Sequence, residues 1–127
     1  MRVKDEVRHP ATRSMLRDFL RDFGLQPTDT NVEHLAVLLE AVEVHDERAR
    51  KYADQWQRAG AFDNLRNARR KVNRQMGTLS TLSETDRVAL AEGNDDDAID
   101  AINYCAFAVR NMRLLNIDEV EDDEEDR

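Results

Sequence analysis

The sequence predicts an all-α protein, a bundle of four to five helices followed by a disordered acidic C-terminal tail. Glycine and proline are scarce, with 4 and 2 residues in a chain of 127, so few positions would interrupt a helix. Apolar residues recur at spacings of three and four, whereas the sustained alternation of a strand is absent. With charged residues at 36%, this combination favours helices over sheets.

Two helices are expected in the first half of the chain. One follows Pro10, which suits the first helical position because the N–H that it lacks would be unpaired there, and Gly24 with Pro27 ends it. The other runs from Thr30, which forms a capping box with Glu33, to about residue 57. The apolar faces are Met15, Leu16, Phe19, Leu20 and Phe23 in the first helix, and Val32, Leu35, Leu38, Leu39 and Val42 in the second.

The second half is expected to begin with two helices after the break at Gly60. A helix that starts near Asp63 stops at Gly77, since glycine is the usual residue just past a helix end. Its expected inner face is Leu65, Ala68, Val72 and Met76. A polar link follows, and then Ser83 with Asp86 indicates a short helix that ends at Gly93.

A central helix is then expected, capped by Asn94 or Asp95. From residue 98 to residue 109 it is apolar nearly all the way round, and such a helix belongs in a protein interior. Cys105, the only cysteine, is accordingly expected to be buried. Asp100 and Asn103 nevertheless lie inside this run, on one face. A buried carboxylate is costly unless it is paired or binds a metal, so Asp100 is expected to have a partner.

Two of the expected helices present acids that could meet. Glu40, Glu43 and Glu47 share one face of the second helix, and Asp97 precedes Asp100 by three residues on the central helix. Such pairs hold hard cations in helical bundles, and oxygen ligands without His or Cys favour Mg²⁺ or Mn²⁺. Two alternatives stay open. The glutamates could form a solvated face, and Asp100 could pair with Arg66, Arg70, Lys71 or Arg74.

The helix from Asp63 is strongly basic. Its cations are Arg66, Arg69, Arg70, Lys71 and Arg74. Such a row suits an anionic ligand such as a triphosphate, and ion pairs with the acids of the chain are the alternative. Trp56, the only tryptophan, could stack on a nucleobase or could equally anchor a core.

The two acidic motifs resemble those of a known family. Glu40-x-x-Glu43 followed by Asp97-x-x-Asp100 is similar to the ExxE…ExxD signature of the MazG-like all-α nucleoside triphosphate pyrophosphohydrolases, which include the dimeric dUTPases. Residues 51–56 and 100–104 resemble a phage branch of nucleotide-modification-associated domains. The resemblance covers residues 35–112 and departs from the signature at Asp97, where the family has Glu, and at Leu39, where it has a doubled Glu. This second departure leaves Glu43 with Glu47 as an alternative pair.

The resemblance implies a Mg²⁺-dependent hydrolysis, with Mn²⁺ as the other candidate metal, of a nucleoside triphosphate to the monophosphate and pyrophosphate. It implies metal ligands at Glu40, Glu43, Asp97 and Asp100, with Glu47 as the base for the attacking water. Lys71 and Arg74 would neutralise phosphate charge, and Asn103 would hydrogen-bond the sugar or orient the ligand. Independently of the resemblance, Trp56 is the candidate for stacking on a nucleobase. A homo-oligomer, dimer or tetramer, is also implied. The competing interpretation is a non-enzymatic helical binding or assembly module, including a relative that binds nucleotide without turnover.

Charge and hydropathy limit the other classes of function. The formal net charge of −8 argues against a general nucleic-acid binder, although a local patch can differ in sign. No run approaches the roughly 18 apolar residues of a membrane span, and the N-terminus lacks a signal-peptide core. A cytoplasmic protein is expected, in the host cytoplasm if a phage encodes it. The expected divisions are an N-terminal helix with linker (1–29), a helical bundle (30–116) and a tail too acidic to pack (117–127).

Overall fold

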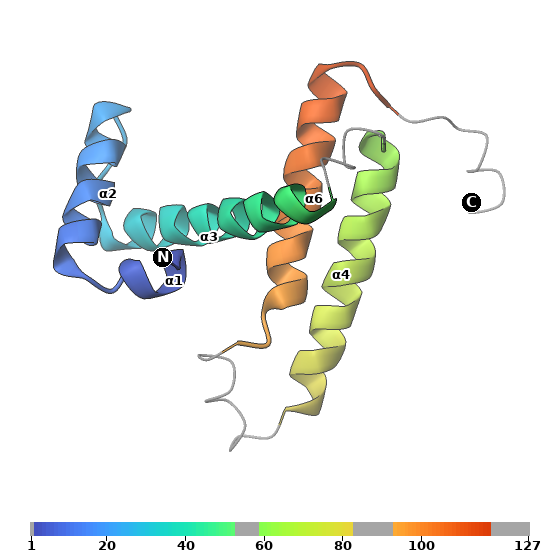
Figure 1. Cartoon of the computed structure of the whole chain (residues 1–127), viewed down its shortest axis with the longest axis horizontal. Coiled ribbons are helices and arrows are strands. Elements are labelled where there is room, and N and C mark those ends of the chain that lie inside the picture. The colour runs from blue at the N-terminus through green and yellow to red at the C-terminus, as the bar shows by residue number, and fades with distance from the viewer. Residues whose placement is uncertain (1, 53–58, 83–92, 118–127) are drawn as a thin grey trace, which may run out of the picture. The chain divides into compact units, whose positions relative to one another are not determined.

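The computed structural model describes residues 2–52, 59–82 and 93–117, and every regular element in these ranges is a helix (Figure 1). The helices are α1 (Val3–Glu6), α2 (Pro10–Asp22), α3 (Asp29–Tyr52), α4 (Ala61–Thr81) and α6 (Asp96–Arg113). The all-α prediction is therefore confirmed. None of these helices is long and apolar enough to cross a membrane. Three predictions fall outside the described residues: the short helix that starts at Ser83, the role of Trp56, and the acidic tail over 118–127.

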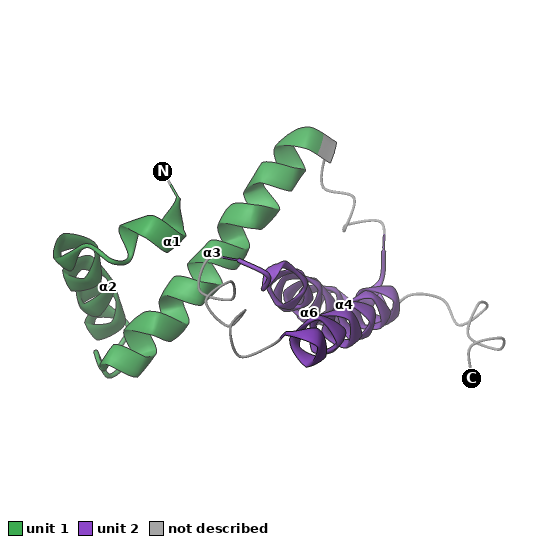
Figure 2. Cartoon of the chain, turned by 90° about the horizontal axis from the view of Figure 1, so that it is seen from below, with its two compact units in different colours: residues 1–51 green, residues 52–127 purple. Residues whose placement is uncertain are grey.

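The chain divides into two compact units, Met1–Lys51 and Tyr52–Arg127 (Figure 2). Unit 1 holds α1, α2 and most of α3, and unit 2 holds α4 and α6. The boundaries expected at residues 29 and 116 stay predictions.

The core of unit 1 lies between α2 and α3. It is formed by Leu16, Leu20, Val32 and Ala36, with Val7 and Leu35 packed against it. As predicted, α2 begins at Pro10 and its end is set by Gly24, which has a φ of 71°. The next N–H, of Leu25, reaches back to the Leu20 carbonyl at 2.9 Å, a Schellman closure that needs a left-handed residue.

The start of α3 differs from the prediction. The capping residue is Thr28 instead of Thr30, because the Thr28 hydroxyl accepts the N–H of Asn31 at 3.1 Å. The Thr28 carbonyl also accepts the N–H of Val32 at 2.9 Å, which is the first intrahelical bond. Thr30 and Glu33 are both exposed residues within the first turns of the helix. Two threonines two residues apart offer competing caps, and the backbone geometry selects the earlier one.

The described part of unit 2 is a pair of helices, α4 and α6, that lie side by side (Figures 1 and 2). They run in opposite directions, since the N–H of Ala61 donates to the carbonyl of Asn116 at 3.0 Å, whereas Gln75 contacts the start of α6. The buried residues of the pair are mostly small or polar: Ala61, Asn64, Ala68 and Gln75 on α4, and Ile99, Asp100, Ala101, Ala108 and Asn111 on α6.

The inner face predicted for α4 is wrong except at Ala68. Leu65, Val72 and Met76 are 45%, 45% and 62% exposed, since the helix turns its alanines and amides towards α6 instead. Small residues let two helix backbones approach closely, which this packing uses in place of large apolar side chains. The stop predicted at Gly77 is also wrong, because α4 continues to Thr81.

Side chains of α4 and α6 form hydrogen bonds at both ends of the helix pair. Gln75 accepts the N–H of Ala98 at 3.1 Å and donates to the carbonyl of Asn94 at 2.7 Å. Asp95 occupies the N-cap position of α6 as predicted, but within the described residues its side chain makes no capping bond. The cap of α6 is therefore supplied by a residue of α4. At the other end, Asn111 donates to the carbonyl of Ala59 at 2.8 Å.

The prediction that Cys105 is buried is wrong, since its side chain is exposed. The face of α6 that packs is carried by residues such as Ala101 and Ala108. The buried residues Asp100, Ala101, Ala108 and Asn111 fall within about 100° of one another around the helix, and Cys105 lies about 90° from the middle of that arc, at about 100° per residue. Helix α6 is apolar on nearly all sides between residues 98 and 109, but only part of its circumference is buried.

Candidate functional site

Asp100 is buried and paired with a cation. Its side chain is 5% exposed, and its Oδ2 lies 3.0 Å from Nζ of Lys71. Asp97 contributes a second carboxylate, with Oδ1 at 3.6 Å from the same Nζ and Oδ2 at 3.7 Å from Nε of Arg74. Of the alternatives that the sequence leaves open for Asp100, the structure contains an ion pair, and Lys71 is its partner.

The ion pair of Lys71 with Asp100 and that of Arg74 with Asp97 differ in burial. The side chain of Lys71 is 20% exposed and lies between two carboxylates of α6, whereas that of Arg74 is 65% exposed. The contact between Arg74 and Asp97 is long and mostly in water, so it contributes little to stability. The contact between Lys71 and Asp100 is short and shielded, so its loss leaves a carboxylate of low exposure without that cation.

The acids predicted to bind metal belong to two different units of the chain. In these ranges no group of three or more His, Cys, Asp or Glu side chains could hold a metal ion. Glu40 and Glu43 belong to unit 1, and Asp97 and Asp100 belong to unit 2. The carboxylates of unit 2 already face an ammonium group, which does not fit a divalent cation at the same oxygens. The convergence of the two acid pairs stays a prediction.

The three glutamates of α3 have separate surroundings. Both carboxylate oxygens of Glu43 accept the N–H of Val3, at 3.2 and 3.1 Å, so this side chain holds the first turn of α1 against α3. Glu40 is partly buried and lines a small groove beside Val7 and Ala36. Glu47 is exposed.

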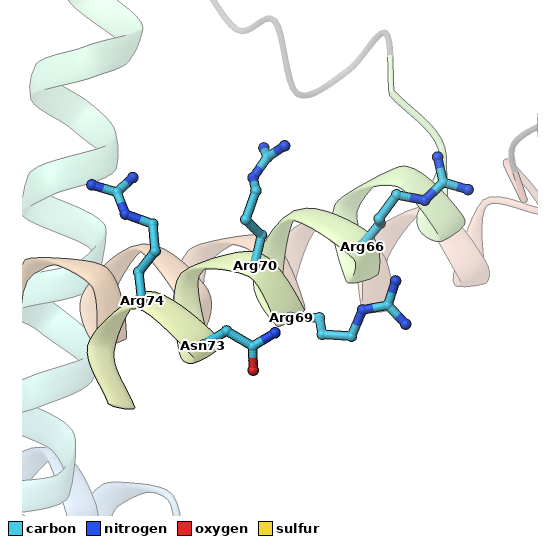
Figure 3. A pocket seen from close by; sticks show the side chains of 5 residues that line it. All are labelled: Arg66, Arg69, Arg70, Asn73 and Arg74. Atoms are coloured by element: carbon cyan, nitrogen blue, oxygen red, sulfur yellow. The ribbon is translucent and has the colours of Figure 1, made fainter. Parts of the chain in front are cut away.

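An open depression on α4 is lined by cations. Its lining residues are Arg66, Arg69, Arg70, Asn73 and Arg74, which we call the basic face. Figure 3 shows Arg66, Arg70 and Arg74 projecting from one side of the helix, and Arg69 with Asn73 leaving from the adjacent side. All of α4 carries five Lys or Arg residues and one acid, Asp63. A protein with an excess of acids therefore has one strongly positive helix.

The geometry of the basic face suits a chain of anionic groups. Residues four apart are displaced by about 6 Å along a helix, so Arg66 to Arg74 covers about 12 Å. Arg66 also contacts Asp63 at 3.3 Å, and its guanidinium lies 4.8 Å from the centre of the Phe62 ring. A guanidinium offers a planar fork of donors that matches phosphate oxygens in pairs.

Comparison with known proteins identified no relative of this chain. The chain matches no protein-family model, no curated protein and no solved structure. The MazG-like resemblance therefore stays a prediction that rests on the two acidic motifs.

The residues predicted to bind substrate are only partly on this face. Arg74 lines it, whereas Lys71 points to the acids of α6. Asn103 lies on α6, is partly buried and is not among the lining residues. The row of cations was predicted to suit an anionic ligand, with Lys71 and Arg74 at the phosphates, whereas Asn73 was not predicted. The repeat of arginine at intervals of four from residue 66 was the signal for the wider face.

Proposed function

We propose that this chain binds a nucleoside triphosphate through the basic face of α4. The observation that supports the proposal is the set of four arginines along one open stretch of helix. A triphosphate presents several charged oxygens in a row, and guanidinium groups bind such oxygens in a bidentate manner. Arg66, Arg70 and Arg74 would contact the phosphates, and the neighbouring amide of Asn73 offers both a donor and an acceptor.

The proposal has an enzymatic form, which the acidic motifs imply. In that form the chain is a Mg²⁺-dependent pyrophosphohydrolase, a dimer or tetramer of the cytoplasm, with Glu40, Glu43, Asp97 and Asp100 at the metal. It requires the two carboxylates of α6 to exchange Lys71 for a divalent cation. The non-enzymatic form, binding without turnover, is favoured by the contacts that Lys71 and Arg74 make with these carboxylates.

Binding is tested first, by titrating ATP, dUTP and inorganic tripolyphosphate in a calorimeter. The variant Arg66→Gln/Arg70→Gln/Arg74→Gln should lose about tenfold or more in affinity, since each surface charge contact contributes up to about 1 kcal/mol. The matched control is Arg8→Gln/Arg21→Gln/Arg50→Gln, which removes the same charge from exposed positions of unit 1. Equal affinities in the two variants would contradict the proposal.

Turnover is tested next, by measuring pyrophosphate release from canonical and modified nucleoside triphosphates with Mg²⁺ or Mn²⁺. Release that Asp100→Asn abolishes, with tripolyphosphate binding retained, supports the enzymatic form. Binding without release in the whole panel supports the non-enzymatic form. Release that survives in Asp100→Asn contradicts the proposed role of Asp100 at the metal.

A further inference from the structure

We propose that the acidic segment 118–126 of this chain docks on the basic face of α4 and competes there with anionic ligands. The proposal shares the basic face with the proposed function but does not depend on nucleotide binding. It rests on where the segment starts, on its length and on its charge.

The described residues that precede the segment are held beside the first turn of α4. After α6 ends at Arg113, Leu115 takes a left-handed conformation with a φ of 59°. The N–H of Asn116 then donates back to the carbonyl of Asn111 at 2.8 Å, which closes a Schellman motif and turns the chain. The carbonyl of Asn116 accepts the N–H of Ala61 at 3.0 Å. The last described residues are thus fixed at the start of the helix that carries the basic face.

The basic face lies within reach of that point. Along the axis of α4, Arg66 is about 7.5 Å and Arg74 about 20 Å beyond Ala61. Nine residues, 118–126, span up to about 30 Å when extended. A short tether also raises the effective concentration of the segment to about the millimolar range.

The charges of the two surfaces are complementary. Eight of the nine residues 118–126 are Asp or Glu. The basic face has four arginines, and Arg110 with Arg113 adds positive charge in the last turn of α6, close to where the segment starts.

Several arginines of unit 1 pair with acids of the same unit. In unit 1, Arg17 pairs with Asp29 at 3.2 Å and Arg50 pairs with Asp46 at 2.8 Å. Helix α4 has five cations, which face Asp63 of the same helix and Asp97 and Asp100 of α6, so the cations of this helix outnumber these three acids by two. An acidic segment of the same chain therefore finds its strongest attraction at α4.

The direct test is an NMR comparison of full-length, isotope-labelled variants without any ligand. The amide signals of residues 118–126 should move when Arg66→Gln/Arg70→Gln/Arg74→Gln is compared with the unmodified chain. They should stay in place in the control Arg8→Gln/Arg21→Gln/Arg50→Gln. They should also move when salt rises from about 10 mM to about 1 M, because the screening length falls from about 30 Å to about 3 Å. Equal responses in the two variants, or none in either, overturn the proposal.

Competition is tested with tripolyphosphate and a full-length variant in which six of the eight acids of the segment are replaced by neutral amides. The substitutions are Glu121→Gln, Asp122→Asn, Asp123→Asn, Glu124→Gln, Glu125→Gln and Asp126→Asn. This variant should bind tripolyphosphate several-fold more tightly at low salt, and the difference should vanish at high salt. Unchanged binding at low salt overturns the competition. If tripolyphosphate binds neither protein, the proposed function fails, and the NMR comparison alone decides whether the segment docks.

Discussion

Replacing Lys71 by Met tests whether the ion pair with Asp100 stabilises unit 2. Methionine keeps a long, unbranched side chain but removes the ammonium group 3.0 Å from Oδ2 of Asp100. The Asp100 residue is 3% exposed, so water cannot easily replace the lost cation. Asp97 would keep Arg74 at 3.7 Å, whereas Asp100 would lose its closest cation.

The magnitude follows from distance and burial. Two unit charges 3.0 Å apart attract by about 5–6 kcal/mol at an effective dielectric constant of about 20. Part of this is offset by the desolvation of Lys71, whose side chain is 20% exposed. Removing one partner of a buried pair costs about 3–5 kcal/mol, so we expect Lys71→Met to lower the free energy of unfolding by about 3 kcal/mol.

The assay is urea unfolding followed by circular dichroism, with hydrogen exchange of the α6 amides to report on unit 2. The matched control is Arg50→Met, which removes a cation 2.8 Å from Asp46 in an exposed pair of α3. Exposed pairs one helical turn apart contribute about 0.3–0.5 kcal/mol. The two pairs have similar distances and different burial, so the comparison isolates the effect of burial.

A loss below about 1 kcal/mol for Lys71→Met, equal to that of Arg50→Met, would refute the reasoning. The companion variant Asp100→Asn should cost less, about 1–2 kcal/mol, because Lys71 keeps Asp97 at 3.6 Å. The double variant Lys71→Met/Asp100→Leu should recover most of the stability, since apolar replacements of a buried ion pair are often neutral or stabilising. A double variant less stable than Lys71→Met alone would count against a simple pair.

Two further predictions concern the ends of α6. Gln75→Met should lower the free energy of unfolding by about 2 kcal/mol, because Ala98 and Asn94 lose their partner, whereas Gln26→Met at an exposed position should change it by less than about 0.5 kcal/mol. An unchanged urea midpoint for Gln75→Met would show that water replaces this cap. Leu115→Gly should raise stability by about 1 kcal/mol, because a left-handed conformation strains any residue with a Cβ and this leucine is 84% exposed. Leu114→Gly, where φ is −91°, should lower the thermal midpoint, and the same sign in both glycine variants would contradict the explanation.

Local signals in the sequence predicted much of the helix pattern. Pro10 and Gly24 mark the ends of α2, because both act through the backbone of their own and neighbouring residues. Local signals misplaced two other boundaries. Thr28 competes with Thr30 for the start of α3, and α4 passes through Gly77.

The sequence predicted which charged residues form the candidate site, but not which of them contact one another. The sequence predicts that Asp100 needs a partner and offers four cations of one helix for it. Helical spacing alone does not decide which of the four meets Asp100. Only the packing of α4 on α6 brings Lys71 to Asp100 and leaves Arg66 and Arg70 on the open face. Glu43, expected at a metal, accepts the N–H of Val3, 40 residues earlier in the chain.

By itself, the sequence determined that the chain is helical, where α2 begins and ends, and that one helix carries a row of cations. These properties depend on residues within about four positions of one another, the range of helical hydrogen bonds and caps. The tertiary structure decided which face of α4 is buried, which cation meets Asp100 and which side chain caps α6. Each of these depends on a residue from another helix, and α4 offers two stripes at helical spacing, Leu65 with Val72 and Ala61 with Ala68. The alanine stripe packs because small residues allow the close approach at which Gln75 and Lys71 reach their partners on α6.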